Sequence, residues 1–61
     1  MNTKIVATNN VRRSMITIKS KIALGNSWIK LNPNKATKED YKRIEELKDV
    51  LEKYEEVYLY N

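Results

Sequence analysis

The chain has 61 residues, with 12 Lys and Arg, 8 Asp and Glu, no Cys and no His, and its formal net charge is +4. The absence of Cys and His excludes a disulfide and a structural zinc site. We expect residues 1–61 to form a single small domain, and a domain of this size buries only about 60% of the surface of its unfolded chain. Its stability must therefore come from tight packing or from association.

The two parts of the chain carry opposite charge. All eight acidic residues lie at or after Glu39, whereas residues 1–36 hold seven basic side chains and no acid. Residues 37–61 hold five basic and eight acidic side chains, so their net charge is −3. This arrangement predicts a protein that meets a charged partner or copies of itself.

The N-terminal part is predicted to form strands. Thr3 to Thr8 reads as a short strand, and the next five residues lack a periodic apolar pattern and read as a loop. Ser14 to Leu24 places Ile16, Ile18, Ile22 and Leu24 on one parity, which is typical of a strand with one buried face.

A β-hairpin is expected next. Gly25-Asn26 suits a type II′ turn between this strand and a second one, Ser27 to Leu31. In that register Trp28 lies beside Ala23 and Ile22 beside Ile29, while Lys21 directly opposes Lys30.

A helix is predicted after Asn32-Pro33-Asn34, because Pro cannot donate to a sheet ladder and Asn favours turns. Thr37 is a plausible N-cap, and acidic residues follow it in the first turn. The helix runs from Lys38 to about Glu56, either unbroken or divided at Lys48-Asp49. Its apolar row consists of Tyr41, Ile44, Leu47, Leu51 and Tyr54.

Val57 to Tyr60 alternates aliphatic and aromatic residues and suits a closing strand. The predicted fold class is therefore α+β: a small antiparallel sheet, made of the β-hairpin and the N-terminal strand, packed against one long or two short helices, with a short C-terminal strand.

Catalytic chemistry has few candidates in this sequence. Without His or Cys the hydroxyl groups have no evident general base, and a single Gly excludes a glycine-rich phosphate loop. Glu45, Asp49, Glu52 and Glu56 share helical spacing, which a solvated helix face explains. We therefore expect no enzyme activity and no catalytic, cofactor-binding or metal-binding residues.

The outer face of the predicted hairpin is the candidate interaction site. There Trp28 lies among lysines, as in proteins that stack a base and follow phosphates. A protein interface would also use an exposed Trp, and plain packing beneath the N-terminal strand is a third interpretation. The residues assigned to this site are Arg12, Arg13, Lys19, Lys21, Trp28 and Lys30, with Tyr58 and Tyr60 as a second, aromatic contact.

The last 34 residues resemble a small module of tailed-phage virion proteins. In that module a strand enters a Pro-containing turn, a capped helix begins at Ser/Thr-x-Glu-Asp-aromatic, and a second helical piece leads into a terminal strand. Asn34 and Glu56 stand where Gly is common in the module. The matching positions are Pro33, Thr37, Glu39, Asp40, Tyr41, Val50, Leu51 and Val57.

We therefore expect a non-catalytic structural or assembly protein of a phage-like particle, acting as a bound subunit with other virion subunits or copies of itself as partners. One alternative is a small nucleic-acid-binding protein that uses the basic and aromatic face. Another is an inhibitor of a host protein whose acidic helix imitates a phosphate backbone. No apolar run is long enough for a membrane span or a signal peptide, so we expect the virion or the host cytoplasm as location.

Overall fold

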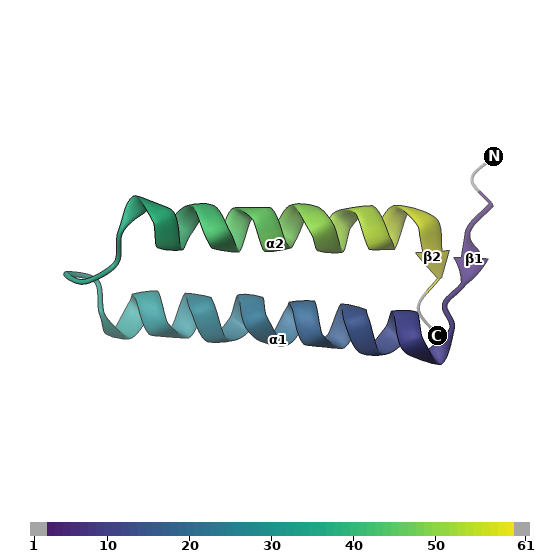
Figure 1. The fold of residues 1–61 in the computed structure, drawn as a ribbon, viewed down its shortest axis with the longest axis horizontal. Coiled ribbons are helices and arrows are strands. Elements are labelled where there is room, and N and C mark those ends of the chain that lie inside the picture. The colour runs from purple at the N-terminus through teal and green to yellow at the C-terminus, as the bar shows by residue number, and fades with distance from the viewer. Residues whose placement is uncertain (1–2, 60–61) are drawn as a thin grey trace.

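The computed structural model describes residues 3–59 and is an antiparallel pair of long helices closed at one end by two very short strands (Figure 1). In chain order the elements are β1 (Ile5–Val6), α1 (Asn9–Leu31), α2 (Lys38–Val57) and β2 (Tyr58–Leu59). The predicted fold class is wrong: the described residues contain no antiparallel sheet, and they are mostly helical.

The predicted β-hairpin is part of α1. Both of its expected strands, residues 14–24 and 27–31, belong to one unbroken 23-residue helix. Gly25 does not have the positive φ that a type II′ turn requires at its first position, so the chain does not reverse there. The expected pairs Trp28 with Ala23, Ile22 with Ile29 and Lys21 with Lys30 consequently do not form.

The residues of α1 that are buried or half-buried explain why the helix prevails. Apart from Arg12 and Ser14, which are also half-buried, these residues are spaced alternately four and three apart, which marks one stripe of an α-helix. A strand would need the alternation from Ile16 to continue through position 20, and that position is Ser. The stripe consists of Val11, Met15, Ile18, Ile22, Gly25 and Ile29.

The helix predicted from Lys38 is present as α2 and is a single helix through Lys48 and Asp49. Thr37 is its N-cap, as expected, and forms a capping box with Asp40. The Thr37 amide donates to Asp40 Oδ2 at 2.8 Å, and the Asp40 amide donates to Thr37 Oγ1 at 3.4 Å. Its buried stripe repeats the four-and-three spacing through Asp40, Ile44, Leu47, Leu51, Tyr54 and Tyr58.

The two stripes pack against each other and make a small core. Among the described residues Ala7, Met15 and Ile44 are buried, and Met15 is the most enclosed at 1% exposure. The helices come close at Gly25, where an added Cβ would lie 3.0 Å from Ile44 Cγ1. The absence of a side chain at this position therefore lets α2 approach α1.

The strands join the two ends of the chain. β1 and β2 are parallel, with Ile5 opposite Tyr58 and Val6 opposite Leu59, and the Ala7 amide donates to the Leu59 carbonyl at 2.9 Å. Both are shorter than the strands predicted at Thr3 to Thr8 and Val57 to Tyr60. Position 60 lies outside the described residues.

The charges of the helix ends favour the antiparallel arrangement. Lys30 lies in the last turn of α1, and the connecting loop brings that turn near the acidic first turn of α2, which holds Glu39 and Asp40. At the other end, the start of α1, which is basic, lies near the end of α2, which is acidic. At both ends the antiparallel arrangement thus brings helix segments of opposite charge together.

The molecule is elongated and thin. Its extents are 44 × 21 × 13 Å and its radius of gyration is 13.9 Å, whereas a compact chain of this length would have about 10–11 Å. A thickness close to one helix diameter means that both broad faces of the helix pair are open. Neither helix, as far as the structure describes them, has the length and apolarity needed to cross a membrane.

Candidate protein-docking surface

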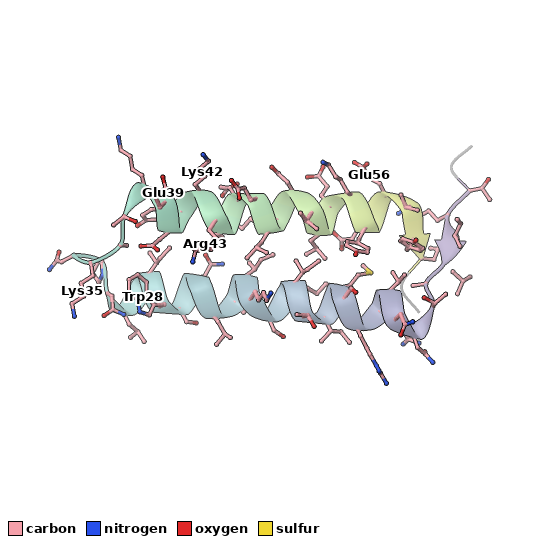
Figure 2. All side chains as sticks on the ribbon, viewed as in Figure 1. Trp28, Lys35, Glu39, Lys42, Arg43 and Glu56 are labelled. Carbon is pink, nitrogen blue, oxygen red and sulfur yellow. The ribbon has the colours of Figure 1, made fainter. Side chains whose placement is uncertain are left out.

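A groove of about 290 Å³ opens along the helix pair, in the half nearer to the loop that joins α1 to α2. Lys21, Gly25 and Trp28 line it from α1, and α2 supplies Arg43 and Leu47. Figure 2 shows Trp28 and Arg43 at this end of the pair, on neighbouring helices. Gly25 and Ile44 meet where they line the groove, since a Cβ at position 25 would lie 3.0 Å from Ile44 Cγ1.

The groove continues into an apolar surface on each helix. From Lys21, successive steps of three and four residues reach Leu24, Trp28 and Leu31, which therefore share one side of α1. These three apolar side chains are 71%, 44% and 80% exposed. We call Lys21, Leu24, Trp28 and Leu31 the α1 row.

The same reasoning gives a row on α2. Arg43, Glu46 and Val50 are three and four residues apart, and Val57 follows seven residues after Val50. Val50 and Val57 are exposed large apolar residues. We call these four residues the α2 row, and the two rows together the groove face, because Lys21, Trp28 and Arg43 all line the groove.

The structure separates the residues of the predicted basic patch. Lys21 and Trp28 are seven residues apart on α1 and lie on the groove face. Lys30 is nine residues from Lys21, or half a turn around the helix, and so points to the opposite side. Lys19 lies off the α1 row as well, because two residues correspond to 200° of rotation.

Arg12 and Arg13 lie in the first two turns of α1, at the far end from the groove. Arg12 is half-buried and Arg13 is exposed. They therefore do not extend a surface centred on Trp28, as the predicted hairpin would have allowed.

The predicted aromatic contact is partly internal. Tyr58 is half-buried, and its ring centroid lies 6.1 Å from that of Tyr54 at a tilt of 32°. Rings at this distance stabilise each other, so Tyr58 completes the stripe that Tyr54 belongs to. Tyr60, the other residue assigned to this contact, lies outside the described residues.

Sequence reasoning missed six residues of the groove face: Leu24, Leu31, Arg43, Glu46, Val50 and Val57. The signal that could have found them is the four-and-three spacing that starts at Val11, since the exposed rows lie beside the buried stripes. It was overlooked because the strand assignment placed Leu24 in the core.

Acidic side chains gather elsewhere, around an open hollow near the strands that is lined by Lys4, Glu52, Glu55 and Glu56. Within residues 3–59 no group of three or more acidic residues is arranged to hold a metal ion. Figure 2 shows Glu56 pointing away from α1, as Lys42 does on the same helix.

Comparison with family models, with curated proteins and with solved structures finds no match for this chain. The sequence and the structure must therefore support any functional proposal by themselves.

Proposed function

We propose that this protein is a non-catalytic subunit that works by binding other protein chains through the groove face. The observation that carries this proposal is the exposure of Trp28, Leu24 and Leu31 beside a groove on a pair of helices with a very small core. Trp is enriched where protein interfaces concentrate their binding energy, and an apolar groove between helices is a common receptor for another helix.

The setting that we propose is a phage-like particle, with other subunits or copies of this chain as partners and the virion or host cytoplasm as location. This setting derives from the resemblance of the last 34 residues. Its capped helix is present in α2, while its first strand, from Trp28, corresponds to helix here. The docking proposal does not depend on that resemblance.

Nucleic acid is the other partner class to be tested. The basic side chains of α1 lie on several sides of the helix, and α2 places eight acidic residues beside them. A strand of phosphates would meet both signs of charge, which weakens its attraction. Protein is therefore the better-supported partner.

The test compares two substitutions in cells that produce the protein. Trp28→Ala removes the exposed ring of the groove face, whereas Tyr41→Ala removes an exposed ring from another side of α2. We expect the parent chain and Tyr41→Ala to fractionate in an assembly larger than a dimer. Trp28→Ala should fractionate as a small species. The purified Trp28→Ala variant should keep its helical circular dichroism, which shows that it still folds. Nuclease treatment should leave the assembly intact.

Three results would contradict the proposal. The parent chain could fractionate without any larger assembly, nuclease could release it, or Trp28→Ala could enter the assembly as well as the parent does. Release by nuclease would favour the nucleic-acid alternative.

A further inference from the structure

The chain exposes more surface than a compact monomer of its mass. The structure exposes 5199 Å². A folded monomer of 7.2 kDa is expected to expose about 4,100 Å². The excess of about 1,100 Å² follows from the elongated, thin shape of the helix pair. Its two broad faces are therefore the surfaces that a partner can cover.

The charges of the two helices indicate what covers it. α1 carries five basic residues and no acid, whereas α2 carries five basic and eight acidic residues and has a net charge of −3. A partner that places an acidic helix on α1 and a basic helix on α2 would match both. A second copy of this chain has both helices at the required spacing.

Two orientations of a second copy are compatible with two-fold symmetry. A two-fold axis across the helices stacks α1 on α1 and α2 on α2, which places five positive charges against five. An axis parallel to the helices stacks α1 of each copy on α2 of the other, so the charges alternate around the four helices. Every neighbouring pair of helices is antiparallel in both orientations, and the second is electrostatically favoured.

We propose that the groove face binds a second copy of this chain, related by a two-fold axis parallel to the helices, and that the two helix pairs form an antiparallel four-helix bundle. The C-terminal half of α1, with Leu24, Trp28 and Leu31, then packs on the N-terminal half of α2 of the second copy. Trp28 lies at the level of the second copy's Arg43, which suits a cation–π contact. This inference rests on the proposed function, because it names the chain that occupies the docking surface.

The charge pair formed by Lys21 and Glu46 can test this orientation. Gly25 lies against Ile44, so Lys21, one turn before Gly25, is level with the turn that follows Ile44. Glu46 belongs to that turn of α2 and lies on the groove face. With the axis parallel to the helices, levels are kept between copies, and Lys21 of each copy comes near Glu46 of the other.

The test measures the mass of the purified chain by sedimentation equilibrium at low salt. We expect a species of twice the 7.2 kDa chain mass. Lys21→Glu and Glu46→Lys should each weaken the dimer about tenfold. By symmetry the contact between positions 21 and 46 occurs twice in the dimer, and each variant places like charges at both contacts. Mixing the two variants should restore the dimer as a heterodimer, since both intermolecular pairs are then of opposite charge.

Lys30→Glu is the matched control, because it makes the same change of charge on the opposite side of α1 and should leave the dimer unchanged. A monomeric parent chain would overturn the inference. So would a dimer that neither reversal weakens, or two weakened variants that do not rescue each other. A separate result would contradict the proposed function: in the cells that produce the chain, it is found only as this dimer and in no larger assembly.

Discussion

Gly25 determines how closely the two helices pack. It lies in the middle of α1, where Gly is less favourable than Ala by about 1 kcal/mol because of its backbone entropy. A methyl group at this position would contact Ile44 at 3.0 and 3.1 Å, which is tight but involves a side chain that borders the groove. Ile44 therefore has space into which it can shift.

Gly25→Ala should raise the free energy of unfolding by less than about 1 kcal/mol, since part of the gain in helix propensity is lost in moving Ile44. Gly25→Leu should lower it by about 1–3 kcal/mol, because the larger side chain cannot fit between the helices. Urea titrations at one fixed chain concentration measure both effects. Asn26→Ala, on an exposed neighbouring position, is the control; equal effects of Ala and Leu at position 25 would contradict the close approach.

Met15 is the most enclosed side chain described, so its truncation should be the most damaging in α1. Met15→Ala should destabilise by about 2–5 kcal/mol, a large share of the 5–15 kcal/mol typical of a folded domain. Ile16→Ala, at a neighbouring position that is half exposed, should change stability much less. Thermal melts followed by circular dichroism compare them, and similar losses at positions 15 and 16 would show that α1 has a different helical phase.

At the scale of the elements, α2 could be predicted because its signals act locally. Thr37 caps the helix through hydrogen bonds to a residue three positions away, and Pro33 interrupts the chain just before it. Such interactions are fixed by sequence spacing alone. The predicted start of the helix at Lys38 is confirmed for the same reason.

Thr37→Ala should destabilise the protein by about 0.5–2 kcal/mol, because the Asp40 amide loses its side-chain acceptor and keeps only the Thr37 carbonyl. Thr17→Ala makes the same chemical change at an exposed position within α1 and should be neutral or slightly stabilising. Denaturation midpoints of the two variants measure the difference. Equal midpoints would indicate that the capping box does not stabilise α2.

The α1 prediction failed because its local signals conflict with its long-range packing. Isoleucines and threonines favour strands, and Gly25-Asn26 is a frequent hairpin turn. The stripe from Val11 to Ile29 favours a helix over a strand only when it can pack against a second stripe of matching spacing. α2 provides that second stripe. Packing of the two stripes outweighs the modest helix preference of β-branched residues.

At the scale of the whole molecule, the expectation of association stays a prediction, whereas the surface predicted for it is changed by the fold. Charge separation and the absence of a disulfide or metal site led to the expectation of association, and neither depends on the fold. The predicted patch depended on strand register, so only Lys21 and Trp28 remain together on the groove face. The side of α1 on which each residue lies could be known only once the helix was known.

The central claim is that this thin pair of helices completes its core by associating. Association of folded chains makes thermal stability depend on concentration, because the folded state gains free energy from its partner and the unfolded state does not. The direct measurement is therefore the melting temperature of the purified chain from micromolar to millimolar concentration. We predict that the melting temperature rises steadily with concentration for the parent chain and less for Trp28→Ala; a melting temperature that stays constant over this range would contradict the claim.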